Sequence, residues 1–381
     1  MDRLPTRETI AVIALPATVK RTLDLSRDLA GLVGEVGSHP VIVTDSQLAA
    51  AGVAGAVESS LGCEVITVPL GEPTSETVSV LAHALSESGA DVVVAVGGGS
   101  VIDSAKLAGR LVADPSGLTR RLLSANPFPP GAAVVALPTT SGSGAEVTRT
   151  AIVFHGGHKT WAWDERLRPE LAVLAPELTA STPRSVAVAA GLDAFVHAVE
   201  AATGQRATAE ITRLGFTAAG VLRDNLPNAI AHPERVDARV RVMDAATAAG
   251  VAIDQCGTGI GHAVGHALAS IVRIPHGLAV MLGFAAGLEW TLETSGDAYR
   301  GLASALGSGV SADTLPAELD MLLEGVGFWA EVERYAPPTA DQLADEMASP
   351  DHQPMCKNNA RVIGSSDLAD IAELVVGFWS R

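Results

Sequence analysis

The chain has 381 residues, of which 48% are hydrophobic and 18% are charged. This composition excludes an intrinsically disordered chain, because such chains combine low hydrophobicity with high charge. The 26 basic and 43 acidic residues give a formal net charge of −17, which disfavours nucleic acid and anionic membrane surfaces as partners. A chain of this length is expected to form roughly two domains.

Cysteine usage and the N-terminal sequence indicate an intracellular protein. Cys63, Cys256 and Cys356 are widely spaced, which is not typical of a disulfide framework or of a thiolate zinc site. Residues 1–16 contain an early acid and only a short apolar run, unlike a secretory signal. No uninterrupted apolar stretch reaches the roughly 18 residues of a membrane span. We therefore expect a cytoplasmic protein without a membrane partner.

Strand and helix signals alternate through the first half of the chain. Apolar runs predict strands over 39–45, 63–70, 90–100 and 132–140, and helical spacing predicts helices over 46–62, 74–89 and 101–114. Alternation at this period predicts an α/β domain with a mainly parallel sheet and helices on both faces.

The second half is predicted to be helical. Strand signals fade after Thr182, where Ala-rich helical stretches begin. Thr182-Pro183 is typical of a helix start, with Thr182 as the N-cap and Pro183 in the first turn. We place the domain boundary near residue 180, which gives an α/β domain over 1–180 and an all-α domain over 181–381. The polar segment 334–360 is expected to form a surface helix and loop.

Two Gly-rich turns follow predicted strands. Gly97-Gly98-Gly99-Ser100 stands between a strand and a helix, where backbone N–H groups can approach phosphate oxygens. The sequence PTTSGSG (138–144) follows the next strong strand, and ligands of open α/β sheets bind at such carboxyl ends. Together the turns favour a nucleotide site, with a tight turn and a surface loop as the alternative interpretations.

Asp45 ends an earlier predicted strand. A carboxylate at this position can accept ribose hydroxyls and would repel a 2′-phosphate, which favours NAD over NADP. An ordinary helix cap is the alternative interpretation.

One carboxylate and four histidines are grouped in the second half. Asp193 and His197 are four residues apart, as are His262 and His266, so each pair shares a helix face, and His276 follows in a Pro-His-Gly turn. Unpartnered polar groups are costly in Ala-rich helices, and a carboxylate with imidazoles suits divalent iron or zinc. A hydrogen-bonded core cluster is the alternative.

The remaining histidines and aromatic residues carry weaker signals. We interpret His155 and His158 as pocket residues or a hairpin tip, and we expect Trp161 and Trp163 to pack. Cys256 lies near the predicted metal helix. Four further histidines are interpreted as solvated: His39, His83, His232 and His352.

Several motifs resemble those of the iron-containing, or group III, alcohol dehydrogenases. They are GGGSVIDSAK (97–106), LPTTSGSGAEVT (137–148), PELTASTP (176–183), GLDAFVHAVEA (191–201) and GIGHAVGHALASIVRIPHG (259–277). The tail CKNNAR (356–361) resembles the family's late Asn-Pro-Arg segment, with Ala in place of Pro. Order and spacing agree from about residue 40 onward.

The resemblance implies an N-terminal dinucleotide-binding domain, a C-terminal helical domain and a homodimer or larger homo-oligomer. The family's metal ligands fall on Asp193, His197, His262 and His276, with Fe²⁺ as the expected ion and Zn²⁺ as the alternative, and its further active-site histidine falls on His266. The expected NAD(H) contacts are Asp45, Gly98, Gly99, Ser100, Asp103, Thr139, Thr140, Ser143, Thr148, Lys159 and Leu178.

The chain departs from the family near the expected cofactor and near the expected substrate. Residues 71–74 (GEPT) replace the usual Pro-Asn-Pro-Thr, and residues 253–258 (IDQCGT) replace an apolar stretch. Thr258 stands one helical turn before His262 and is expected to face a polar pocket, with Arg149 as a candidate anion partner. The expected pocket residues are Thr150, Ile253 and Thr258.

These observations predict an NAD(H)-dependent, metal-assisted alcohol dehydrogenase or aldehyde reductase. Its substrate is expected to be a small polar or anionic aldehyde or alcohol. One alternative is a non-redox NAD- and metal-dependent enzyme similar to dehydroquinate synthase, but the chain has no rich set of basic residues for a phosphorylated substrate. The other is an enzyme similar to maleylacetate reductases, a group that lacks this full metal set.

Overall fold

The computed structural model describes residues 15–380 except 17, 123–126 and 157. The chain divides into an N-terminal unit, Leu15–Thr182, and a C-terminal unit that begins at Pro183. The division falls close to the boundary expected near residue 180. Residues 1–14, which are most of the N-terminal stretch that we expect not to be a secretory signal, lie outside the described residues.

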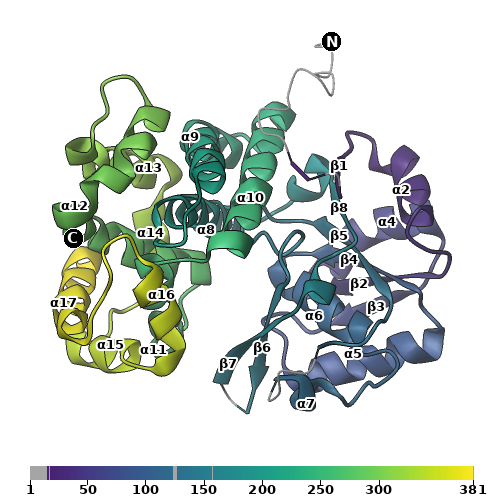
Figure 1. The fold of residues 1–381 in the computed structure, drawn as a ribbon. Coiled ribbons are helices and arrows are strands. Elements are labelled where there is room, and N and C mark those ends of the chain that lie inside the picture. The colour runs from purple at the N-terminus through teal and green to yellow at the C-terminus, as the bar shows by residue number, and fades with distance from the viewer. Residues whose placement is uncertain (1–14, 17, 123–126, 157, 381) are drawn as a thin grey trace, which may run out of the picture. The chain divides into compact units, whose positions relative to one another are not determined.

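A six-stranded sheet forms the centre of the N-terminal unit (Figure 1). Its strands are β1 (Val19–Arg21), β2 (Pro40–Asp45), β3 (Val65–Val68), β4 (Val92–Gly97), β5 (Ala133–Pro138) and β8 (Leu171–Leu174). The strand order is β1-β8-β5-β4-β2-β3, and every neighbouring pair is parallel. A separate antiparallel hairpin joins β6 (Thr150–His155) to β7 (His158–Trp163). The predicted parallel α/β domain is confirmed.

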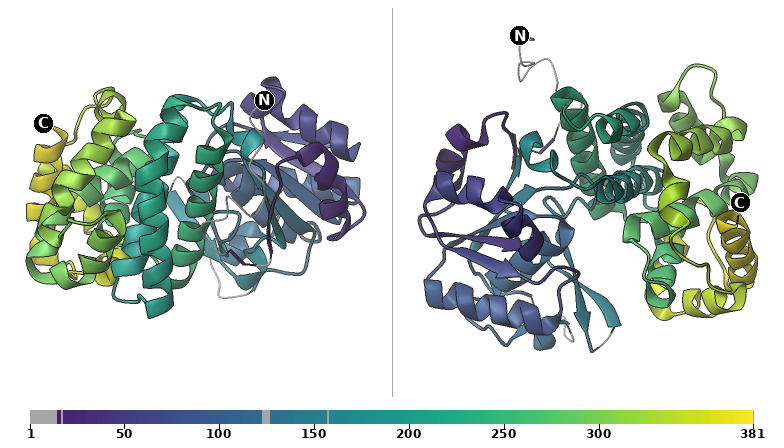
Figure 2. Two further views of the ribbon diagram at one scale, coloured as in Figure 1. Left: turned by 90° about the horizontal axis from the view of Figure 1, so that it is seen from above. Right: turned by 180° about the vertical axis from the view of Figure 1, so that it is seen from behind.

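Helices cover both faces of this sheet (Figure 2). They are α2 (Leu25–Gly34), α3 (Ser46–Ala50), α4 (Val53–Leu61), α5 (Ser75–Ser88), α6 (Gly99–Arg110) and the short α7 (Leu118–Leu122). In β4, Val93 and Ala95 join one hydrophobic core with residues of α5 and α6, whereas Val92, Val94 and Val96 join another with residues of α2 and α4. Successive strand residues point to opposite faces, so burial on both faces explains the uninterrupted apolar run of β4.

The helix predicted over 46–62 is two helices, α3 and α4. Gly52 separates them with φ of +78°, a left-handed backbone that glycine adopts without steric cost. Gly62, with φ of +62°, ends α4 as predicted. The first break was missed because apolar residues continue at helical spacing across Gly52.

The C-terminal unit is all helical in the part of the chain that the structure describes (Figure 1). Its helices are α8 (Arg184–Thr203), α9 (Ala209–Ala231), α10 (Val236–Cys256), α11 (Ile260–Ile271), α12 (His276–Leu306), α13 (Leu315–Val326), α14 (Phe328–Val332), α15 (Ala340–Met347), α16 (Gln353–Asn358) and α17 (Leu368–Trp379). The cap predicted for α8 was wrong by one residue: Pro183 is the N-cap, and the Thr182 hydroxyl instead donates to the Thr139 carbonyl at 2.8 Å.

Helix α8 is long and apolar enough to cross a membrane by length and composition alone. However, 83% of its apolar 18-residue stretch is buried within the protein. The helix also carries the buried polar residues Asp193, His197 and Glu200. These features identify α8 as the central helix of the C-terminal unit.

Asp91 ties the start of β4 to the loop before β2. Its carboxylate accepts the N–H of His39 at 2.7 Å, the N–H of Ser38 at 3.0 Å and the Ser38 hydroxyl at 2.9 Å. These hydrogen bonds, led by that of the His39 amide, lower the pKa of Asp91 from 3.8 to about 2. Because the folded pKa is below the unfolded one, the stabilisation is present above pH 3.8 and is lost as the pH falls towards 2.

We expect Asp91→Asn to lower the free energy of unfolding at pH 7 by about 1 kcal/mol, a modest value because the site is partly exposed. Hydrogen exchange at the Ser38 and His39 amides should accelerate at neutral pH, and the difference from wild type should shrink below pH 3.8. The exposed Glu87→Gln is the charge-matched control. Unchanged amide protection at pH 7 would contradict this role of Asp91.

Candidate metal centre and nucleotide site

One carboxylate and three imidazoles converge inside the C-terminal unit. Asp193 and His197 lie on α8, His262 lies on α11, and His276 is the first residue of α12. The Nε2 atoms of His197 and His262 each lie 3.7 Å from Asp193 Oδ1, and that of His276 lies 3.8 Å away. The structure therefore brings together the four predicted ligands from three helices.

The geometry of this cluster fits a divalent ion. The three separations from Asp193 Oδ1, 3.7–3.8 Å, are longer than hydrogen bonds, and they approach the distances of about 3.4 Å between ligands of a tetrahedral site with bonds of about 2.1 Å. The ligand atoms of Asp193, His262 and His276 all lie within 4.8 Å of one another. Asp193 Oδ1 is buried and accepts no hydrogen bond from a described residue. Such an atom is costly in a protein interior, and a cation would satisfy it. Three imidazoles and a carboxylate suit Fe²⁺ or Zn²⁺.

Glu200 contacts Nδ1 of His262, the ring nitrogen that does not face Asp193. Its Oε2 lies 2.7 Å from His262 Nδ1, and the carboxylate also accepts the N–H groups of Gly259 at 2.8 Å and Gly261 at 2.6 Å. Burial raises the pKa of Glu200 to about 7, although these hydrogen bonds oppose the shift. A nearby divalent charge favours the ionised carboxylate. A carboxylate on Nδ1 fixes the tautomer and directs the Nε2 lone pair towards an ion.

Sequence reasoning missed Glu200, although a signal was present. Asp193, His197 and Glu200 stand at i, i+4 and i+7, so all three lie on one face of α8.

The C-terminal segment fixes the turn that precedes α11. Asn359 Oδ1 accepts the N–H of Ile260 at 3.1 Å, and Asn358 Nδ2 donates to the Thr258 carbonyl at 2.9 Å. Thr258 therefore lies in the turn before the helix and not, as predicted, one helical turn before His262 on the same helix.

The other expected pocket residues have identifiable packing roles. Ile253 packs against a small hydrophobic cluster that includes Ala201, Ile211 and the buried Cys256. Thr150 begins β6 in the N-terminal unit, and its carbonyl accepts from Lys106 Nζ at 2.9 Å. Their contact with substrate stays a prediction.

His266 and His352 extend the group of imidazoles beyond the predicted metal ligands. The His266 ring centroid lies 5.3 Å from that of His276 and 6.4 Å from that of His352. The prediction that His352 is solvated was wrong, because only 5% of the residue is exposed. The segment that carries it packs against α11, with α15 and α16 alongside (Figure 1).

The two Gly-rich turns lie side by side in the N-terminal unit. In the parallel pair β4–β5, Gly97 is opposite Pro138, and the Thr139 N–H donates to the Gly97 carbonyl at 3.0 Å. Gly98 is the N-cap of α6, and no side chain caps this helix. The first N–H groups of a helix have no intrahelical acceptor, so they remain available to an anion such as a pyrophosphate.

The three glycines of the first turn serve different purposes. A Cβ on Gly97 would lie 2.5 Å from Val101 Cβ, and one on Gly99 would lie 2.7 Å from Ser143 Oγ. These two glycines permit tight packing. A Cβ on Gly98 would meet only Thr140, at 3.4 Å, so Gly98 preserves a space that a methyl group would fill. The turn therefore fits a dinucleotide phosphate.

Other expected NAD(H) contacts also have roles within the fold. Asp45 Oδ1 caps α3, accepting the N–H groups of Gln47 at 2.8 Å and Leu48 at 2.9 Å. Leu178 lies in a short 3₁₀ helix, Pro176–Thr179, and is buried in a core of the unit. The capping interpretation of Asp45 is thus observed, and its ribose contact stays a prediction.

Asp103 and Lys106 of α6 form a buried pair. Asp103 accepts from Lys106 Nζ at 3.4 Å and from the Ile152 N–H at 2.9 Å, and Lys106 also donates to the Thr148 hydroxyl at 3.2 Å. Burial raises the pKa of Asp103, and the Lys106 ammonium opposes this shift. These contacts join α6 to the β6–β7 hairpin.

The β6–β7 hairpin presents charged and aromatic groups at its surface. Lys159 pairs with Glu72, one of the residues at which the chain departs from the family. Arg149 pairs with Glu165 and stacks at 4.4 Å over the Trp163 ring. Trp161 and Trp163 are 40% and 58% exposed, so neither is a core residue, and the packing of Trp163 is its contact with Arg149.

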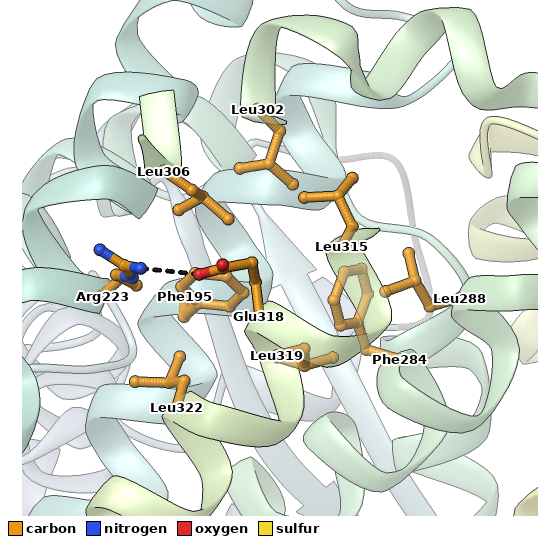
Figure 3. A pocket seen from close by; sticks show the side chains of 10 residues that line it. All are labelled: Phe195, Arg223, Phe284, Leu288, Leu302, Leu306, Leu315, Glu318, Leu319 and Leu322. Atoms are coloured by element: carbon orange, nitrogen blue, oxygen red, sulfur yellow. Dashed lines mark hydrogen bonds and ion pairs between the residues drawn. The ribbon is translucent and has the colours of Figure 1, made fainter. Parts of the chain in front are cut away.

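A separate pocket of the C-terminal unit is mainly apolar (Figure 3). Phe195 and Phe284 contribute to its wall, together with several leucines, and Arg223 and Glu318 pair with each other at 2.6 Å. Because its two charged groups neutralise each other, we assign this pocket to packing around α8.

Two family models together match most of the chain. The model for iron-containing alcohol dehydrogenase matches residues 16–176, and the C-terminal model for the Fe-containing alcohol dehydrogenase family matches residues 187–348. The chain belongs to the iron-containing alcohol dehydrogenase family. The resemblance predicted from the motifs is confirmed.

Named relatives match over part or most of the chain. The chain is 33% identical over 248 residues to the probable alcohol dehydrogenase EutG of Escherichia coli, a match that covers 63% of each protein. It is 29% identical over 297 residues to the NAD-dependent methanol dehydrogenase of Bacillus methanolicus, covering 74% of this chain and 78% of that protein. The match to EutG thus spans less than two thirds of that relative.

Solved structures agree with the fold over nearly the whole chain. The sulfoacetaldehyde reductase of Bifidobacterium kashiwanohense in complex with NAD⁺ matches with a TM-score of 0.86 and 22% identity, over 95% of this chain and 98% of that chain. An iron-containing alcohol dehydrogenase from Thermococcus thioreducens matches with a TM-score of 0.82 and 25% identity, over 94% and 98%.

We expect Glu200→Gln to weaken Zn²⁺ binding about 10-fold and Glu200→Ala about 100-fold, because loss of a carboxylate behind a metal-bound histidine typically has effects of this size. Competition with a chromophoric chelator measures the affinity. The exposed Glu210→Gln is the matched control on α9, and circular dichroism checks folding. Wild-type affinity in both Glu200 variants would show that Glu200 does not support the ion.

Gly98→Ala is expected to leave the fold intact, since φ of −76° and ψ of −174° suit alanine. The added methyl group occupies the space next to the α6 N-terminus, so NADH affinity should fall about 10-fold, or about 1.4 kcal/mol. NADH fluorescence titration measures the affinity. Gly97→Ala, whose Cβ meets Val101 at 2.5 Å, should instead lower stability. Normal NADH binding by Gly98→Ala would place the phosphates elsewhere.

Proposed function

We propose that this protein is an NAD(H)-dependent, metal-assisted alcohol dehydrogenase that interconverts a small aldehyde and its alcohol. In the reducing direction, the aldehyde carbonyl takes a hydride from NADH at carbon and a proton at oxygen, giving the alcohol and NAD⁺. The observation that carries the proposal is the convergence of the Asp193 carboxylate with His197, His262 and His276.

The chain's residues have distinct roles in this reaction. When bound, a divalent ion polarises a carbonyl oxygen and NAD(H) carries the hydride. Asp193 and the three histidines hold the ion, and Glu200 keeps the His262 lone pair directed towards it. The α6 N-terminus holds the pyrophosphate, beside the 139–143 turn.

His266 is the proposed proton donor to the carbonyl oxygen. It lies beside His276 but is not among the four converging residues. An imidazole is suited to this role because its protonation changes near neutral pH.

We propose Fe²⁺ as the resident ion, with Zn²⁺ as the alternative. The family description supports iron. The donor set itself suits both ions, and metal availability decides between such ions more than affinity does. We propose NAD(H) over NADP(H) because the Asp45 carboxylate would repel a 2′-phosphate.

The proposed substrate is a small polar aldehyde or alcohol. The names of two relatives indicate small substrates of this kind. One is the sulfoacetaldehyde reductase of Bilophila wadsworthia, 33% identical over 252 residues. The other is the 1-propanol dehydrogenase PduQ of Salmonella typhimurium, 32% identical over 257 residues. Arg149 is an unsuitable anion partner, because it pairs with Glu165 and stacks on Trp163. The homo-oligomer and the cytoplasmic location stay predictions.

NADH absorbance tests the function directly. Purified protein loaded anaerobically with Fe²⁺ should oxidise NADH in the presence of propanal or a polar aldehyde of similar size. His262→Ala should lose metal and activity together, since it removes a ligand. The exposed His232→Ala is the matched control. Absence of NADH oxidation with every aldehyde, despite bound metal and NADH, would refute the proposal and favour a non-redox reaction.

A further inference from the structure

His352 is a buried histidine without a role in the reaction described above. It ends a 3₁₀ helix, Pro350–His352, that packs against α11, the helix that carries His262 and His266. Only 5% of His352 is exposed. The polar atoms of an imidazole in such a position are usually hydrogen-bonded.

The contacts of His352 define which of its nitrogens is available. Nδ1 lies 3.0 Å from the carbonyl oxygen of Glu346. A carbonyl oxygen can only accept a hydrogen bond, so Nδ1 carries the proton. In the neutral ring Nε2 is then an acceptor, and no described residue donates a hydrogen bond to it. The group that complements Nε2 is therefore a hydrogen-bond donor such as a hydroxyl.

His352 lies next to His266, the proposed proton donor. A hydroxyl bound to His352 Nε2 would therefore also lie near His266. The ring centroids of His352 and His266 are 6.4 Å apart, with planes at 70°. Two imidazoles joined by a direct hydrogen bond of about 3 Å would have centroids roughly 5 Å apart. The observed centroid spacing of 6.4 Å is too long for a direct bond, and it matches the spacing expected for two rings that both hydrogen-bond to one oxygen atom. From the metal ligands outward, the order is His276, His266 and His352.

We propose that His352 Nε2 accepts a hydrogen bond from a second hydroxyl group of the substrate. The preferred substrate is then a small hydroxyaldehyde, or the corresponding diol in the oxidising direction. This inference rests on the proposed function and narrows its substrate class. A carboxylate or sulfonate has no proton to donate, so an Nε2 that acts as a hydrogen-bond acceptor selects a hydroxyl over an anion.

Two substitutions test the roles of the two ring nitrogens of His352 separately. His352→Asn places an amide near the position of Nδ1, where it can still donate to the Glu346 carbonyl, but it removes the polar atom at Nε2. His352→Gln places a polar group near Nε2 instead. Glycolaldehyde and propanal are matched substrates, because they differ by a hydroxyl in place of a methyl group. Sulfoacetaldehyde is the anionic comparison, and the exposed Asp351→Asn is the control variant.

We expect wild-type kcat/KM to favour glycolaldehyde over propanal by about 10-fold or more, since a site built for a hydroxyl rejects an analogue that lacks it. His352→Asn should lose most of this preference while its kcat/KM for propanal stays within about 3-fold. His352→Gln should retain part of the preference. Metal content and NADH affinity should be unchanged in both variants. In a binding assay, ethylene glycol should bind more weakly to NAD⁺-loaded His352→Asn than to the NAD⁺-loaded wild type.

The contrary outcomes identify what fails. A preference retained in His352→Asn but lost in His352→Gln would show that only the Glu346 contact matters, which overturns the hydroxyl site. Equal loss on propanal and glycolaldehyde would assign His352 to positioning His266 and also overturn it. A wild-type preference for sulfoacetaldehyde would replace the hydroxyl with an anion. If wild type reduces no aldehyde at all, the proposed function fails, independently of His352.

Discussion

The burial of carboxylates in an Ala-rich helix is the constraint on which the C-terminal unit depends. Asp193 and Glu200 lie on α8 and are 6% and 3% exposed. A buried carboxylate is unstable unless charges and hydrogen-bond donors surround it closely. The neighbouring elements supply them: α11 and the turn before it contribute two backbone N–H groups and the His262 ring to Glu200. The packing of this unit is therefore organised around polar atoms.

Small residues allow these helices to approach closely enough. A Cβ on Gly277, directly after His276, would lie 2.0 Å from the Ala189 carbonyl of α8. A Cβ on Gly283 of α12 would lie 2.5 Å from Val264 Cβ of α11. Glycine at both helix crossings removes these clashes. As a result, three helices deliver imidazoles to one carboxylate oxygen, which a looser packing of larger side chains would prevent.

Much of the fold and part of the site could be predicted because their signals are local. Continuous apolar runs indicated buried parallel strands, and i, i+4 spacing placed Asp193 with His197. Glu200 was predictable by the same spacing. His352 was not, because its burial depends on contact with a helix some 90 residues earlier in the chain, while its own segment is polar. Gly52 and Thr258 were misjudged for a related reason: helical periodicity does not reveal where a helix breaks or begins.

The two units apply the same physical principle to opposite charges. At the start of α6, backbone N–H groups without intrahelical acceptors create a site for an anion, and Gly98 keeps side chains away from it. Around Asp193, buried oxygen and nitrogen atoms suit a cation. Asp193 Oδ1 has no hydrogen-bond partner among the described residues, and no side chain caps the start of α6. A bound ligand offsets this cost, so the same atoms that lower the stability of the free protein give it affinity for a phosphate group or a metal ion.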